Sequence, residues 1–174
     1  MNHLLMPHPS HPSRAITSVG CNVHRRPGGL ILRYTIEGDL GRLVLPPLAK
    51  PYRTDGLWRS TCLELFAAEA GNGYAEYNFS PSGAWAAYAF SGRREGMAPL
   101  ALDMPPDIHA HHEGAYLLVT VLLDGIDPGP LRLGITAVIE EKDGTKSYWA
   151  LHHGGDAPDF HDPDCFVAQL PPAD

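Results

Sequence analysis

The chain has 174 residues, of which 44% are apolar, and this is enough to bury one full-sized core, so we expect a single domain. Its formal net charge of −7 argues against nucleic-acid binding and against binding to an anionic membrane, because both require a basic face. Eighteen glycines and seventeen prolines interrupt the chain too often for long helices and favour many short strands.

The N-terminal segment shows no secretory signal, because its apolar start at residues 4–6 is stopped at once by Pro7. No apolar run is long enough to cross a bilayer. The three cysteines are far apart and odd in number, which is typical of reduced thiols. We therefore expect a cytoplasmic protein.

Residues 1–13 interleave histidine with proline, and prolines at 7, 9 and 12 disfavour regular hydrogen bonding. We expect this segment to be a flexible arm that precedes one domain over residues 14–174.

Beyond the arm, apolar and polar residues alternate in short runs, the period-two pattern of strands. The pattern predicts strands at 15–23, 30–37, 42–45, 62–67, 74–79, 84–90, 114–123, 131–140, 146–152 and 165–170. The run 114–123 is apolar on both faces, which indicates a central strand. Segments 46–56 and 91–106 are expected to be irregular. The sequence thus predicts an all-β fold of nine to eleven short strands, a two-sheet antiparallel β-sandwich or a jelly roll, and the alternation alone does not choose between these topologies.

Residues 57–90 hold the densest cluster of aromatic side chains beside isolated polar ones. Turns at Gly71-Asn72-Gly73 and Pro81-Ser82-Gly83 divide it into a three-stranded meander. Tyr74, Glu76 and Asn78 fall on one face of its second strand, an arrangement suited to a binding groove.

The residues of this meander resemble those of the superfamily of family-9 carbohydrate-binding modules (CBM9) and DOMON domains. The resemblance lies in Leu57-Trp58, in 62–66, in 74–83 and in Trp85. The closing segments 147–151, 158–161 and 165–166 resemble the bacterial DOMON-like branch in particular. The resemblance extends over most of the chain from about Ile16 onward. It implies a two-sheet β-sandwich whose concave sheet or adjoining loops bind sugars in some members and haem in others.

A sugar site needs an aromatic ring to stack on a pyranose and polar side chains to exchange hydrogen bonds with its hydroxyls. Aromatic residues also fill sandwich cores, so packing is the competing role for each tryptophan. Tyr148 and Arg94 could support such a site. The candidate ligand-binding residues are Trp58, Glu64, Tyr74, Glu76, Asn78, Trp85, Arg93, Trp149 and His161. We expect a non-catalytic binder of a saccharide or a similar small polar ligand, as a monomer or weak homodimer.

Two alternatives remain open at this point. A b-type haem, as the resemblance allows, could take Met97 or Met104 and one of the histidines at 152, 153 and 161 as axial ligands. A divalent metal could instead be held in the loop between His152 and His161, with His153 also available, although no familiar zinc spacing is present. No catalytic motif of a hydrolase elbow, P-loop or dinucleotide type is present, so enzymatic activity is not expected.

Overall fold

The computed structural model describes residues 1–48, 50–68 and 71–173 of the chain. Part of the predicted loop 46–56 (residue 49), residues 69 and 70, and residue 174 lie outside the described residues. The strands of the described part are β1 (Asn2–Pro7), β2 (Ile16–Arg26), β3 (Gly29–Gly38), β4 (Cys62–Ala68), β5 (Tyr74–Phe79), β6 (Trp85–Phe90), β7 (Ala98–Pro99), β8 (Asp107–Glu113), β9 (Tyr116–Asp124), β10 (Leu131–Glu140), β11 (Lys146–Ala150) and β12 (Ala168–Leu170). Three short 3-10 helices accompany them in these residues: η1 (Leu40–Arg42), η2 (Leu57–Arg59) and η3 (Pro163–Cys165). The all-β prediction is confirmed. None of these helices approaches the length and hydrophobicity needed to span a membrane.

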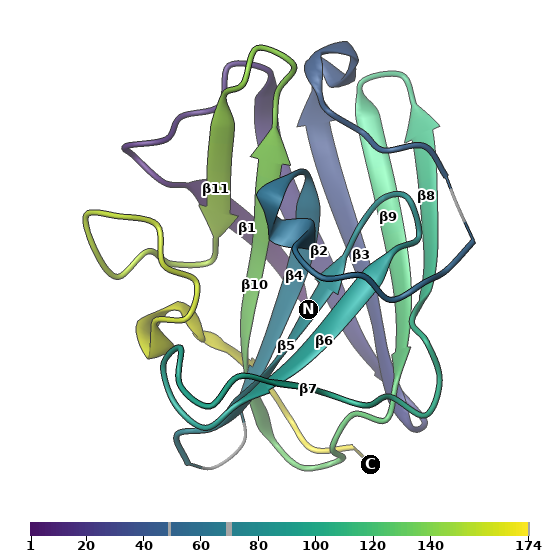
Figure 1. Cartoon of the computed structure of the whole chain (residues 1–174), viewed down its shortest axis with the longest axis vertical. Coiled ribbons are helices and arrows are strands. Elements are labelled where there is room, and N and C mark those ends of the chain that lie inside the picture. Colours follow the sequence, from purple (N-terminus) through teal and green to yellow (C-terminus); the bar gives the residue numbers. More distant parts are fainter. Residues whose placement is uncertain (49, 69–70, 174) are drawn as a thin grey trace.

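The strands form one curled antiparallel sheet, in the order β7-β6-β5-β4-β10-β11-β1-β2-β3-β9-β8, with β12 paired to β10 (Figure 1). We call β4–β7 and β10–β12 the front half, and β2, β3, β8 and β9 the back half. Strand β1 belongs to both, because residues 2–5 pair with β2 while Met6 and Pro7 pair with β11. The hydrogen-bonded ladder therefore runs continuously from one half to the other, where two separate sheets had been predicted.

The ordered β1 corrects the prediction of a flexible arm at residues 1–13. Leu5 is only 1% exposed and packs in the main core, and the backbone N–H of His8 donates to the carbonyl oxygen of Tyr148 at 2.7 Å. The prolines do not prevent this strand because Pro7 is its last residue and the others follow it.

The main core lies between the two halves, and the front half presents its odd-numbered residues to it. Each pairing among β10–β11, β4–β10, β4–β5 and β5–β6 joins odd to odd and even to even residues. All even-numbered side chains of these strands therefore point to the opposite, outer face. A second apolar cluster covers that outer face, and the loop after β11 contributes Phe160 and Phe166 to it.

The structure departs from the predicted strands in three places. The run expected to be buried on both faces, β9, has only β8 between it and the edge, and its Tyr116 and Leu118 are exposed. Strand β8 was missed because its sequence, DIHAHHE, is polar almost throughout. Backbone pairing with β9 stabilises this strand, and the side-chain pattern of the segment gave no indication of it. The short strand expected at 42–45 is a single bridge between Leu43 and Glu141.

Candidate ligand-binding cavity

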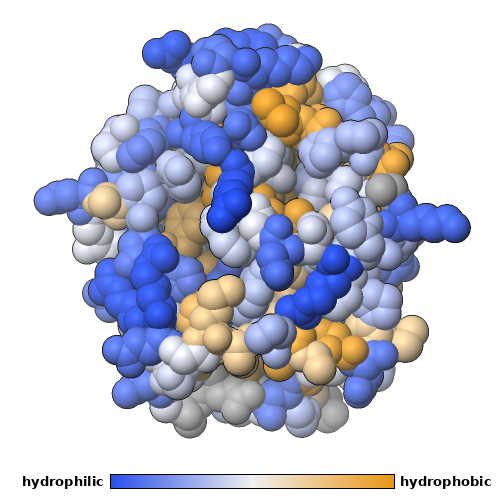
Figure 2. Space-filling view, viewed as in Figure 1, coloured by the Kyte–Doolittle hydropathy of each residue, from blue (hydrophilic) through white to orange (hydrophobic). Residues whose placement is uncertain are grey.

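A cavity of about 360 Å³ opens on the outer face of the front half. This volume lies at the lower end of the range of small-molecule sites, roughly 300–1,000 Å³, so the cavity suits one small ligand. Hydrophobic atoms are visible between hydrophilic ones on this side of the molecule (Figure 2). The cavity is lined by Trp58, Glu64, Phe66, Glu76, Phe90, Arg94, Met97, Val138, Tyr148, Pro158, Phe160 and His161.

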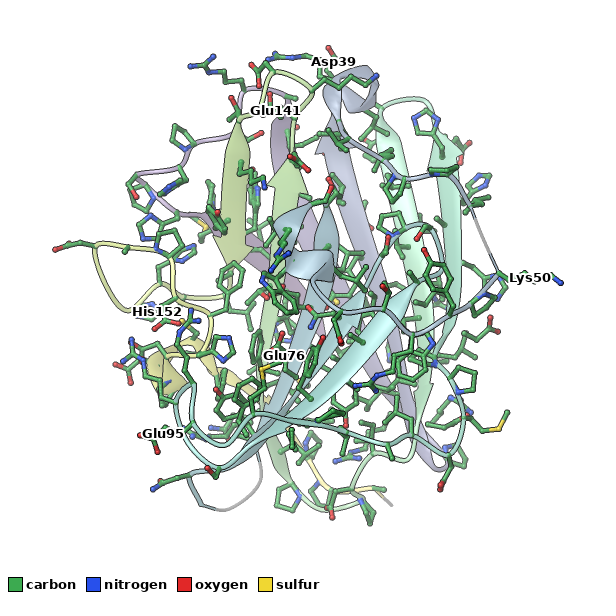
Figure 3. The ribbon with its side chains drawn as sticks, viewed as in Figure 1. Asp39, Lys50, Glu76, Glu95, Glu141 and His152 are labelled. Carbon is green, nitrogen blue, oxygen red and sulfur yellow. The ribbon has the colours of Figure 1, made fainter. Side chains whose placement is uncertain are left out.

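The sheet positions its share of this lining through the even-numbered face. Glu64 pairs with Asn78 of β5 on one side and with Thr136 of β10 on the other, while Glu76 pairs with Phe66. Glu64 and Glu76 are therefore diagonal neighbours on adjacent strands, close enough for their side chains to interact. Figure 3 shows Glu76 near the middle of the front half.

A polar network within the sheet holds one oxygen of each carboxyl group. Glu76 Oε1 accepts a hydrogen bond from Asn78 Nδ2 at 2.6 Å, and Asn78 Oδ1 accepts one from Cys62 Sγ at 3.5 Å. Glu64 Oε2 accepts one from Thr136 Oγ1 at 2.8 Å. The two carboxyl groups are almost fully buried, with Glu64 2% and Glu76 5% exposed. Their orientations are thus fixed before any ligand arrives.

Burial controls the protonation of these groups. It raises the pKa of Glu64 to about 8, and the neighbouring Glu76 adds to the rise. Burial also raises the pKa of Glu76, against the opposing effects of the Asn78 hydrogen bond and the charge of Arg94. Burial, together with the charge of Arg94, lowers the pKa of His161 to about 4. At neutral pH Glu64 is protonated and His161 is neutral, so the 3.7 Å approach of His161 Nε2 to Glu76 Oε2 is a polar contact without full charge pairing.

Two loops close one side of the cavity and are tied together at Asp159. Arg93 contacts its Oδ2 at 2.7 Å, and Arg94 contacts its Oδ1 at 2.9 Å. The backbone N–H of His161 donates to Oδ1 of the same carboxylate at 3.1 Å. We call this arrangement the Asp159 clamp. It fixes the 91–97 loop against the loop between β11 and β12.

Tyr74 anchors the cavity side of the clamp. Its hydroxyl makes a 2.7 Å hydrogen bond with His161 Nδ1 and accepts one from the backbone N–H of Arg94 at 3.2 Å. Arg94 has a φ of 57°, the single positive φ among the described non-glycine residues. Such a left-handed conformation is costly for a residue with a side chain, and here it occurs in the tight turn that the Gly92–Glu95 bridge closes.

The structure brings most of the predicted site residues together. Trp58, Glu64, Glu76 and His161 line the cavity. Tyr74 and Asn78 lie directly behind the lining, where they hold His161 and Glu76. Arg93 lies at the rim, bound to Asp159 and half exposed, and is not part of the lining.

Trp85 and Trp149 are not platforms for a ligand, because both lie in the main core. They occupy odd-numbered positions, which face inward throughout the front half. The guanidinium of Arg53 lies over the Trp85 ring at 5.5 Å, and the indole N–H of Trp149 donates to Ser147 Oγ at 2.9 Å. Trp85 is paired with Phe79 across the second hairpin, and paired residues share one face of the sheet. This pairing could have assigned Trp85 to the core face.

Several lining residues were not predicted as site residues. Phe66, Phe90 and Val138 follow from the same even-numbered face as Glu64 and Glu76, so the period-two pattern could have indicated them. Pro158 and Phe160 come from a loop, whose path no periodicity predicts.

Neither cofactor alternative is supported by the geometry. His161 Nδ1 is hydrogen-bonded to the Tyr74 hydroxyl and its Nε2 faces Glu76 Oε2 across 3.7 Å, so haem iron bound opposite Met97 would have to displace one of these contacts. Met104 is exposed and outside the lining.

The metal alternative depends on the histidines of the loop after β11. His153 Nε2 contacts the carbonyl oxygen of Met6 at 2.9 Å, and His152 is labelled in Figure 3 on the loop, well apart from Glu76. Across the described residues, no group of three or more His, Cys, Asp or Glu side chains is placed to hold a metal.

Comparison with known proteins supports the fold. No known family profile matches the chain, and no curated protein does. The fold is similar to that of a crystal structure named as a putative carbohydrate-binding protein from Bacteroides uniformis, with a TM-score of 0.69 and 15% identity. The match covers 96% of this chain and 84% of the other. At this identity the likeness establishes the general fold alone.

Proposed function

We propose that the protein is a non-catalytic module that binds a saccharide, or a similar small polar ligand, in the cavity of the front half. The observation that carries the proposal is that an aromatic ring, Trp58, and two carboxyl groups, Glu64 and Glu76, line the same cavity. A pyranose presents C–H groups that stack on such a ring and hydroxyls that bond to such carboxyl groups. The carbohydrate-binding name of the structural neighbour is consistent with this chemistry.

The cavity offers both donors and acceptors. A protonated Glu64 donates as well as accepts, and Glu76 Oε2 faces the His161 ring across 3.7 Å. Trp58 packs edge-to-face on Tyr88, with ring centroids 5.9 Å apart, so its orientation is restrained. Restraint of this kind lowers the entropic cost of binding a small ligand.

The proposal includes a finer assignment of the fold. The front and back halves would correspond to the two layers of a sandwich of the family-9 module and DOMON type, with β1 shared between them. The predicted cytoplasmic location and monomeric or weakly dimeric state form part of the same proposal.

The test is a saccharide screen by glycan array, followed by titration calorimetry on the hits. Trp58→Ala should weaken binding about tenfold or more, because losing an aromatic contact of roughly 1.4 kcal/mol changes a dissociation constant tenfold. Trp58 is 37% exposed, so the fold should survive its truncation. Tyr116→Ala is the matched control, because Tyr116 is an exposed aromatic of the back half. If folded protein binds no saccharide, the proposal is wrong.

A further inference from the structure

The two carboxyl groups of the cavity lack a positively charged partner. The side-chain carboxyl group of Glu64 accepts a hydrogen bond from the Thr136 hydroxyl through Oε2, and within the described part of the chain no hydrogen bond reaches its Oε1. Glu76 bonds to the Asn78 amide and faces a neutral His161. Buried carboxylates are normally compensated by a cation, and in these residues the protein supplies none by direct contact.

The arginines of the rim do not fill this role. The Arg94 side chain lines the cavity, but its Nη2 and Nε both bond to Asp159 Oδ1, at 2.9 and 3.2 Å. Arg93 is shared between Asp159 and Asp162, with Nη2 at 2.7 Å and 3.0 Å from their carboxylates. Two arginines thus face two aspartates at the rim. Their charges balance locally, and neither arginine makes a direct contact with the carboxyl group of Glu64 or Glu76.

The walls of the cavity favour a cation as well. Aromatic rings present a negative face, and a cation within about 6 Å of a ring centroid is attracted to it. The aromatic side chains of the lining are Trp58, Phe66, Phe90, Tyr148 and Phe160. Aromatic walls above two buried carboxyl groups match a ligand that carries a compact positive charge.

We propose that the ligand of this cavity carries a protonated amino group, which binds between Glu64 and Glu76, so that the preferred saccharide is an amino sugar. This inference rests on the proposed saccharide function and names the chemical class of its ligand. The ammonium group supplies three donors, which match the Oε1 of Glu64 and the Oε2 of Glu76. The sugar ring then packs against the aromatic walls.

The protonation behaviour of the cavity agrees with this geometry. The pKa of each glutamate is raised mainly by burial, as expected for carboxyl groups without a bound cation. The titratable and charged groups around the pair are Tyr34, Cys62, Tyr74, Tyr88, Arg94 and His161. Of these, Arg94 alone carries a positive charge at neutral pH, and Asp159 holds it. A bound ammonium group would stabilise the carboxylate form of Glu64, which would then release its proton to the solvent.

The experiment is titration calorimetry of the full chain at about pH 7 with three sugars. D-glucosamine carries the amino group, N-acetyl-D-glucosamine keeps the nitrogen without its charge, and D-glucose lacks both. D-glucosamine should bind about tenfold more tightly than either neutral sugar, because its ammonium group makes charge-assisted hydrogen bonds to the carboxyl groups that the neutral sugars cannot make. Glu64→Gln and Glu76→Gln should each reduce this preference. Both substitutions keep an acceptor for Thr136 or Asn78, so circular dichroism should show a folded protein.

Glu113→Gln serves as the matched control, because Glu113 is a highly exposed carboxylate on β8. It should leave the preference unchanged. Equal affinities for the three sugars, or a preference that persists in both cavity variants, would overturn the inference.

A fourth probe, cyclohexylamine, separates this inference from the proposed function. Neutral sugars that bind as well as D-glucosamine reject the amino-group inference and leave saccharide binding intact. Binding of cyclohexylamine without any sugar rejects saccharide binding and retains the cationic preference. Binding of none of the four rejects both.

Discussion

At the scale of single residues, Glu64 couples the cavity to the stability of the whole protein. Its pKa rises from an ordinary 4.5 to about 8 because the side chain is buried among apolar groups and near Glu76. A carboxyl group whose pKa is higher in the folded state than in the unfolded state stabilises the fold while it stays protonated. That contribution is complete below about pH 4.5 and is lost as the pH rises through about 8.

Replacement of Glu64 by glutamine removes this dependence. We expect the free energy of unfolding of the natural protein, measured relative to Glu64→Gln, to fall by a few kcal/mol between about pH 4.5 and about 8. Urea denaturation over a pH series measures the difference. His161 acts in the opposite direction, because its lowered pKa costs stability as the pH falls from 6.5 through about 4. It is present in both proteins, so its effect largely cancels.

The same series with Glu113→Gln gives the baseline for an exposed carboxyl group. A difference between natural protein and Glu64→Gln that stays flat with pH would show that Glu64 titrates normally in the folded state.

At the scale of elements, the loop between β11 and β12 is seated on the sheet at Gly134 of β10. A Cβ at this position would lie 2.6 Å from the Phe166 ring and 3.3 Å from the Cβ of Phe66. Contacts of 2.6 Å are not tolerated, so the ring or the loop must move. The absence of a side chain at Gly134 therefore sets how closely the loop approaches the outer face.

Gly134→Ala should lower the free energy of unfolding by about 1–3 kcal/mol, the usual cost of overpacking. The expected displacement of Phe166 should also weaken ligand binding at the cavity, since Phe66 lines it. Chemical denaturation and calorimetry measure the two effects. Gly155→Ala is the control, because nothing lies within 4 Å of the position of its Cβ and its φ is not in the left-handed region. Equal stability of the two variants would contradict this account of the loop.

Alternation in the sequence predicted the central elements well, because strands of the front half have one face on the core. The predicted strand 74–79 coincides with β5, and 131–140 coincides with β10. Two strands carry no such signal: the edge strand β8 has few apolar residues, and in β1, which lies between β11 and β2, histidines and prolines concealed the buried Leu5. Pairing with neighbouring strands forms these elements, and pairing is not visible in one segment alone.

The site was partly predictable for the same reason. Glu64 and Glu76 follow from the face of the meander, whereas the Asp159 clamp joins loops distant in sequence. The inward Trp85 shows that an aromatic residue must be assigned to a face before it is assigned to a site.

At the scale of the whole molecule, β1 joins the front and back halves. Adjacent leucines test its role, because Leu5 is 1% exposed in the main core and Leu4 is 64% exposed. Leu5→Ala should lower the free energy of unfolding by about 2–5 kcal/mol, as for other buried leucines. Leu4→Ala should change it by less than about 0.5 kcal/mol. Thermal and urea denaturation measure both. If neither substitution changes the free energy of unfolding, the flexible arm predicted from the sequence is favoured.

In the front half, odd-numbered residues face the core and even-numbered residues face the cavity side, and this alternation limits which mutations can change ligand binding. Core and cavity residues alternate along β4 and β5, so loss of a single codon within β5 would move Tyr77 or Phe79 toward the outer face and Asn78 or Glu76 toward the core. Such a deletion cannot abolish ligand recognition while sparing the fold. Length variation among natural sequences should therefore concentrate in exposed turns, such as Gly71-Asn72-Gly73, and in the loop after β11. Substitutions at even positions alone should be the route by which ligand preference changes.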